Sequence, residues 1–279
     1  MLNSDPKEKL PSIKNTLTEA IALYRGRFRD FSLVMGFQSV VSLAYYYIVF
    51  IINPGYWWLQ SLAGLFFVGI GIVTAIIQIY LVSDKKITIR QSLVKTKGKI
   101  IGAFWIYFLV FIIIFGGAYL FLIPLAIFST WFAFSRYIFL FESESGMDAI
   151  LKSREYVRGY FWPIFVRLLI SVVFSIVFYL VPSFTFLKAL PKPFLYFWST
   201  FWAFFATPVF LIYWLVIYRQ LVSIKNLGVF KATNGKKALY LGFGLLSIVV
   251  FFLLAFLIIV IFAMAYVAKN PSSFVNNPL

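Results

Sequence analysis

Four short basic clusters, each built around a glycine, lead into apolar stretches of this chain. The glycines are Gly26, Gly98, Gly159 and Gly235. Each of the first three clusters is followed by enough apolar sequence for two membrane crossings, and an even number of crossings returns the chain to the face from which it started. The repeat therefore predicts the architecture and the topology of the chain together.

The composition excludes a water-soluble domain. Of the 279 residues, 62% are hydrophobic and only 12% are charged, and the charges are separated from long uncharged segments. This segregation is typical of a chain whose spans lie in the hydrocarbon core of a bilayer. A hydropathy window of about 19 residues predicts seven spans, at residues 31–52, 57–82, 101–121, 123–141, 161–181, 194–221 and 239–267.

The segments that precede the first, third and fifth spans have apolar residues at helical spacing. The apolar faces consist of Ile13, Leu17, Ala20, Ile21, Tyr24 and Phe28, then Ile89, Leu93 and Ile100, then Met147, Ile150, Leu151 and Val157. We expect each segment to form an amphipathic elbow helix that lies on the cytoplasmic surface and bends into its span near the glycine.

The predicted fold is an all-α polytopic transmembrane bundle with about seven spans, forming a single integral membrane domain over residues 1–279. It consists of three repeats of an elbow helix plus a transmembrane hairpin, at about 11–82, 88–141 and 147–221, and an extra half unit at 226–267 that adds a C-terminal span. Because each complete repeat has two spans, the repeats are parallel rather than inverted, unlike those of many transporters.

The charge distribution predicts the orientation. Lys and Arg number six in the amino-terminal arm, six in the 83–100 loop, three in the 142–160 loop and five in the 217–237 loop, against three on the opposite side. Basic residues concentrate on the cytoplasmic side of membrane proteins. We therefore expect a multi-pass protein of the cytoplasmic membrane, with the N-terminus in the cytoplasm and, after seven spans, the C-terminus outside.

The basic residues beside the spans predict contact with anionic lipids, because Lys and Arg attract the negatively charged leaflet. These interfacial clusters are Arg25, Arg27, Lys95, Lys97, Lys99, Arg154, Arg158, Lys236 and Lys237. Membrane lipids are thus the expected partners. The sequence indicates no nucleic-acid partner, and it identifies no protein partner.

Arg136 and Arg167 lie inside the predicted spans, outside the basic segments at the cytoplasmic ends of the spans. Each lies five or six residues from the cytoplasmic end of its span, so consecutive spans place them at similar depth. One interpretation is that both extend toward lipid phosphates at the inner interface. The other is a shared anion pocket for a lipid headgroup or an amphiphilic substrate, with Gln78, Ser135 and Ser171 as hydrogen-bond partners.

The residues that most catalytic and metal sites need are missing. The chain has no His and no Cys, and the predicted spans contain no Asp or Glu. These absences argue against a metal centre, a thiolate nucleophile and a carboxylate proton relay within the membrane. We expect no cofactor and no enzymatic activity. Four acidic residues on the cytoplasmic side are interpreted as a solvated helix and turn: Glu142, Glu144, Asp148 and Glu155.

The segment 130–170 resembles a known family. It has a Trp and an Arg late in one span, an acidic turn at 142–146, then Ala149–Ser153 and Val157–Trp162. This pattern is similar to the membrane domain attached to some bacterial glycerophosphodiester phosphodiesterases, which also occurs alone in uncharacterised bacterial and archaeal membrane proteins. Residues 17–28 look like the opening helix of that family. The resemblance covers most of the first 225 residues and implies six spans, so the seventh span departs from it.

Two functions follow as expectations. The first is a non-enzymatic protein that binds anionic lipids through its basic elbow helices and has a membrane-organising or accessory role. The second is a permease or lipid-transfer protein for an apolar or amphiphilic anionic substrate that passes Arg136 and Arg167. The few scattered Ser, Thr and Gln residues of the spans disfavour a water-filled path.

Overall fold

The computed structural model describes residues 10–52, 56–84, 86–120, 122–184, 192–225, 227–228 and 230–269. Within these ranges the chain is all-α, with no strand. The helices are α1 Ile13–Gly26, α2 Phe28–Tyr46 (continued by a π-helical segment, Tyr47–Ile52), α3 Trp57–Ser83, α4 Ile89–Lys97, α5 Ile100–Leu120, α6 Leu122–Trp131, α7 Ser135–Phe141, α8 Gly146–Val157, α9 Phe161–Phe184, α10 Lys192–Lys225 and α11 Asn234–Lys269.

Several helices are long and apolar enough to cross a membrane. Four qualify alone, at Phe28–Val49, Trp58–Ser83, Ile123–Phe141 and Phe197–Lys225. Two bent pairs bring the number to six: α4 with α5, which meet at 71°, and α8 with α9, which meet at 107°. The polytopic all-α fold is therefore confirmed, with four to six candidate spans among the described residues. The seventh predicted span lies in α11, which is helical throughout, and its membrane crossing stays a prediction.

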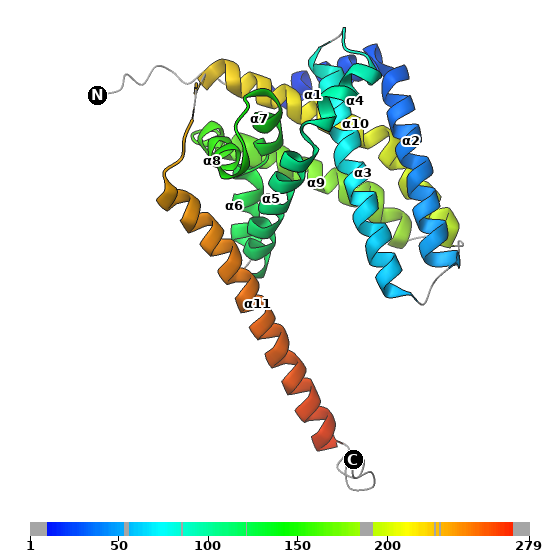
Figure 1. The fold of residues 1–279 in the computed structure, drawn as a ribbon, viewed down its shortest axis with the longest axis vertical. Helices are drawn as coiled ribbons and strands as arrows, with labels where there is room; N and C mark the ends of the chain where they lie inside the picture. Colours follow the sequence, from blue (N-terminus) through cyan, green and yellow to red (C-terminus); the bar gives the residue numbers. More distant parts are fainter. Residues whose placement is uncertain are drawn as a thin grey trace.

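The helices follow the predicted order of an elbow helix and then a hairpin. Figure 1 shows α2 and α3 running side by side, α10 crossing the molecule, and α11 extending away from the other helices toward the C-terminus. The first part of α11 packs against α5. Gly244 permits this close approach, because a Cβ there would lie 2.8 Å from the Ile112 side chain.

The first two elbow helices bury only part of the predicted apolar faces. In α1 the buried residues are Thr16, Ala20 and Tyr24, whereas Leu17 is 42% exposed. In α4 the buried residues are Ser92 and Thr96, whereas Leu93 and Val94 are exposed. Small side chains allow close contact between helices, and the apolar side chains then face the surroundings of the bundle. The predicted apolar stripes are thus only partly the packing faces.

The third elbow helix is buried, which corrects the prediction of a surface helix. Eight of the 12 residues of α8 are buried, including Lys152 and Ser153. The Ser153 hydroxyl donates to the Trp131 carbonyl at 2.7 Å and accepts from the Phe134 N–H at 3.1 Å. It thereby satisfies the backbone of the turn at 132–134, which separates α6 from α7. Helix α8 is therefore part of the core.

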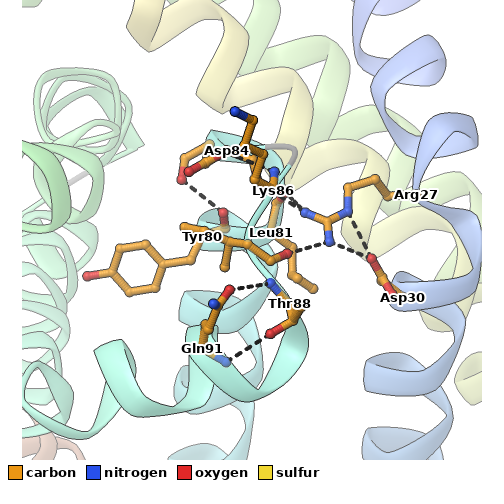
Figure 2. A network of polar contacts seen from close by, with 10 residues as sticks. Arg27, Asp30, Tyr80, Leu81, Asp84, Lys86, Thr88 and Gln91 are labelled. Atoms are coloured by element: carbon orange, nitrogen blue, oxygen red, sulfur yellow. Dashed lines mark hydrogen bonds and ion pairs between the residues drawn. The ribbon is translucent and has the colours of Figure 1, made fainter.

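Arg27 connects the first elbow to the second (Figure 2). Its guanidinium pairs with Asp30 at 2.6 Å and donates to the carbonyls of Leu81, Asp84 and Ile87, around the end of α3 and the turn into α4. A cation at a helix C-terminus satisfies the unpaired carbonyls and opposes the helix dipole. Helix α4 then begins with a capping box between Thr88 and Gln91. Arg27 is thus held by protein contacts.

The acidic turn is packed against the protein, and the interpretation that it is solvated was wrong for three of its four residues. The Glu142 carboxylate pairs with Lys152 at 2.6 Å and accepts from the hydroxyls of Tyr218 at 2.6 Å and Tyr156 at 3.2 Å. Further along the chain, the Glu144 carboxylate accepts from the Phe230 N–H at 3.0 Å. The Asp148 carboxylate accepts from the Ala232 N–H at 2.9 Å. These bonds hold the segment before α11 against the acidic turn and the start of α8.

Only one of the four elbow glycines has a backbone conformation that favours glycine. Gly159 has φ +86°, in the left-handed region, at the 107° bend between α8 and α9. Gly26 ends α1, Gly98 directly follows α4 with φ −73°, and Gly235 lies in the first turn of α11. A Cβ at any of these three would meet no atom within 4 Å. Their shared sequence context therefore does not reflect a shared backbone geometry.

Candidate functional site

A cavity of about 600 Å³ lies among α3, α5, α6, α7, α9 and α10. Its walls are predominantly apolar, with side chains such as Ile106, Leu168, Phe210 and Trp214. Arg136 is the only charged residue among the described residues that line it. A largely apolar cavity of this size with a few convergent polar groups is the typical form of a small-molecule site.

Arg136 lacks a carboxylate partner. None of the ion pairs among the described residues includes it, and its Nε atom has no hydrogen-bond partner there. One of its Nη atoms donates to the Tyr137 hydroxyl at 3.0 Å, which in turn donates to the Leu211 carbonyl on α10 at 2.9 Å. This chain of bonds and a further hydrogen bond to the Tyr107 hydroxyl hold the guanidinium in place, and the Nε–H is left as a donor for an anion.

Three serine hydroxyls around the cavity are committed to the backbone. Ser135 donates to the Phe132 carbonyl, Ser171 to the Arg167 carbonyl and Ser175 to the Ser171 carbonyl, all at 2.9 Å. A hydroxyl that has donated its proton offers only lone pairs to a ligand. Compared with these three hydroxyls, the Arg136 guanidinium is the strong donor to an anion.

The cavity extends from the basic end of the bundle toward its middle. Arg136 lies five residues before the end of α7, or about 8 Å along the helix axis, whereas Ser175 lies about 21 Å along α9 from Phe161. Val172 and Ile176 also line the α9 side and are 44% and 48% exposed, so the cavity opens to the surroundings of the bundle there. It thus has a cationic end, an apolar end and a lateral opening.

The structure brings together three of the five residues proposed for the anion site. Arg136, Ser135 and Ser171 line the cavity, and Arg167 and Gln78 do not. The Arg167 guanidinium instead donates to the carbonyl of Pro11, just before α1. The Gln78 amide lies 2.9 Å from the Met35 sulfur in the contact between α2 and α3. The two arginines therefore do not form the predicted shared pocket, because Arg167 is hydrogen-bonded to the amino-terminal arm at Pro11.

The basic clusters divide into exposed residues and residues held by protein contacts. Arg25, Lys95, Lys97, Arg158 and Lys236 are exposed. The others contact protein groups: Arg27 as described, Lys99 with the Phe139 ring at 5.0 Å, Arg154 with the Trp131 ring at 4.8 Å, and Lys237 with Asp148 at 2.7 Å. A count of basic residues in the sequence thus overestimates the charge available to lipid.

Within the described residues, no group of three or more His, Cys, Asp or Glu side chains is arranged to hold a metal ion. The acidic residues of the 142–148 turn neutralise Lys152 and Lys237 instead. Sequence reasoning missed this role. The signal available was the alternation of Glu and Ser in 142–145 directly before a helix that carries Lys152.

Comparisons with family models, with curated proteins and with solved structures found no match to this chain. The resemblance to the membrane domain of glycerophosphodiester phosphodiesterases therefore stays a prediction.

Proposed function

We propose that this chain is a non-enzymatic integral membrane protein that binds an anionic amphiphile in the Arg136 cavity and acts as a lipid-binding or lipid-transfer protein. The observation that carries the proposal is the cavity itself, a laterally open apolar space with a single arginine at one end. The proposed location is the cytoplasmic membrane, with the N-terminus in the cytoplasm.

The chemistry of the cavity matches a ligand with one charged end. A guanidinium without a carboxylate partner in a poorly hydrated site favours a carboxylate or phosphate group, with which it forms charge-assisted hydrogen bonds. The apolar wall beyond it favours a hydrocarbon tail, whose burial is worth about 25 cal/mol per Å². A ligand with a single anionic end and an apolar body satisfies both requirements.

A second candidate function is membrane organisation through the basic elbows. One observation favours it: α4 exposes Leu93 and Val94 beside Lys95 and Lys97. Such a surface binds anionic lipid through long-range attraction, which salt screens over about 8–10 Å. Lipid held in the cavity by Arg136 is less sensitive to salt, because the partners are desolvated. The two functions are thus separated by their dependence on ionic strength.

Native mass spectrometry of the purified full-length protein tests the proposal. The wild type is expected to retain an anionic lipid after delipidation in detergent at high salt, and Arg136→Gln is expected to lose it. Ser175→Trp, which fills the apolar end without changing the charge, is expected to lose it as well. Re-addition of phosphatidylglycerol restores the bound species in the wild type alone.

The matched control is Lys95→Gln/Lys97→Gln, which removes exposed charges that are not part of the cavity lining. It is expected to reduce only the lipid that high salt also removes. Equal retention of lipid at high salt by the wild type, Arg136→Gln and Ser175→Trp refutes the proposal and leaves the exposed elbows as the lipid contacts. Melting temperatures of all variants confirm that the fold is intact.

A further inference from the structure

A second concave site lies outside the Arg136 cavity. It is a groove of about 860 Å³ between α6 and the bend that joins α8 to α9, and the start of α11 contributes to one edge. None of the residues that line it also lines the Arg136 cavity. The groove is therefore a separate surface feature.

The rim of the groove carries a net positive charge. Arg154, Arg158 and Lys236 are its cations and Glu155 is its one acidic residue. Glu155 pairs with Arg158 at 3.6 Å, and the Arg158 side chain is 81% exposed, so this pair is weak. No ion pair among the described residues includes Arg154 or Lys236.

The floor of the groove is apolar. Its side chains include Ile123, Ala126 and Ile127 on α6, and Trp162 and Phe165 on α9. Ile123 and Trp162 are 71% and 70% exposed. Trp131, under the Arg154 guanidinium, lies eight residues after Ile123, so the apolar part of the groove extends about 12 Å along α6 from the cationic rim.

We propose that this groove binds one membrane phospholipid with an anionic headgroup, which contacts the exposed Arg158 and Lys236, while an acyl chain lies along α6 and Phe165. Charge complementarity argues for the headgroup. The exposed Trp162 and Ile123, which have no favourable contact in water, argue for the chain. Indole rings concentrate at the membrane interface, where an apolar face and a polar rim meet. This site is additional to the ligand of the Arg136 cavity.

The test uses the full-length protein in nanodiscs that contain phosphatidylglycerol and phosphatidylcholine, with a phosphatidylglycerol analogue that carries a photoactivatable group on its acyl chain. Labelling is expected in peptides that contain Ile123–Ile127 and Trp162–Phe165. Arg158→Gln/Lys236→Gln is expected to reduce the label there by about fivefold for each charge removed. The matched control, Arg25→Gln/Lys95→Gln, removes two exposed charges outside the groove.

A steric variant separates a defined groove from diffuse attraction. Ala126→Trp fills the apolar floor and leaves every charge in place, so it is expected to lower the labelling, whereas Val94→Trp at an exposed site outside the groove is not. Unlabelled phosphatidylglycerol competes with the probe, and glycerol phosphate does not. Competition by glycerol phosphate indicates a site for free anions and overturns the proposal, as does equal loss of label in the Arg25/Lys95 control.

The outcome is independent of the Arg136 cavity. Arg136→Gln is expected to leave the groove labelling unchanged, and Arg158→Gln/Lys236→Gln is expected to leave the salt-resistant lipid of the cavity bound. If the groove is not labelled while Arg136→Gln still loses its lipid, only the groove is refuted. If the groove is labelled and Arg136→Gln retains as much lipid at high salt as the wild type, only the proposed ligand of the Arg136 cavity is refuted.

Discussion

Lys152 shows how a charged residue is accommodated in the core of this bundle. Its side chain is 2% exposed, and its ammonium group contacts carboxylates of Glu142 and Glu144 and the carbonyl of Gly228. Burial removes water from the ammonium group and from the carboxylates, which costs free energy. The ion pairs and the hydrogen bond between these groups offset that cost. The cluster ties α8 to the end of α7 and to the segment before α11.

Replacing Lys152 with Met is expected to lower the free energy of unfolding by about 3–5 kcal/mol, because two partly buried carboxylates lose their counter-ion. Adding Glu142→Gln to Lys152→Met is expected to recover part of the loss. Arg158→Gln, which removes an exposed pair, is expected to change it by less than about 1 kcal/mol. Unfolding in mixed micelles measures all three. Equal losses in Lys152→Met and Arg158→Gln contradict the account of this cluster.

Among the helices, the elbows differ from one another more than their sequences do. The first two, α1 and α4, leave apolar residues such as Leu17 and Leu93 at the surface, whereas α8 is enclosed by its neighbours. The bends also differ, because only the one at Gly159 uses a left-handed residue. The three repeats thus share the order of their helices, but each elbow helix makes different contacts with the rest of the protein.

Gly159→Ala is expected to destabilise the protein by about 1–2 kcal/mol, because a Cβ disfavours the φ of +86° at this bend. Gly98→Ala is the matched control, since its φ is −73° and a Cβ there meets open space. We expect that control to stay within about 0.5 kcal/mol of the wild type. Melting temperatures of both variants in detergent measure the effect. If Gly159→Ala and Gly98→Ala lower the melting temperature equally, the left-handed conformation at the bend is not the cause.

The elements could be predicted from the sequence because the apolar runs and the charged loops alternate at membrane length. The predicted spans at 57–82 and 101–121 differ from α3 and α5 by no more than one residue at either end. The contacts could not be predicted, since helical spacing does not reveal which side of an elbow helix meets protein and which meets lipid. Arg167 illustrates the point, because its partner is a carbonyl 156 residues away.

At the scale of the whole molecule, the side of the membrane on which the C-terminus lies depends on whether α11 crosses the bilayer. It projects from the bundle (Figure 1), and large apolar side chains along it are exposed, including Phe252, Phe256 and Phe262. Such a surface requires an apolar environment. If α11 crosses the bilayer, the C-terminus lies on the side opposite the basic elbows.

The chain contains no Cys, so single cysteines report topology without background. Lys95→Cys is expected to react with a membrane-impermeant maleimide only after the cells are opened, and Ser273→Cys is expected to react in intact cells. The reason is the bias of Lys and Arg toward the elbow side. Reaction of both cysteines under the same condition contradicts the seven-span topology.

The central claim is that an anionic amphiphile occupies the Arg136 cavity, and site-resolved photolabelling tests it most directly. A single-chain anionic lipid with a photoactivatable group near the end of its chain is equilibrated with the wild type, Arg136→Gln and Lys95→Gln/Lys97→Gln at high salt. We predict label on Leu168–Ile176 of α9 and on Ala206–Trp214 of α10 in the wild type and the lysine variant, and its loss in Arg136→Gln. Label confined to exposed apolar residues such as those of α11, with the same pattern in all three proteins, contradicts the claim.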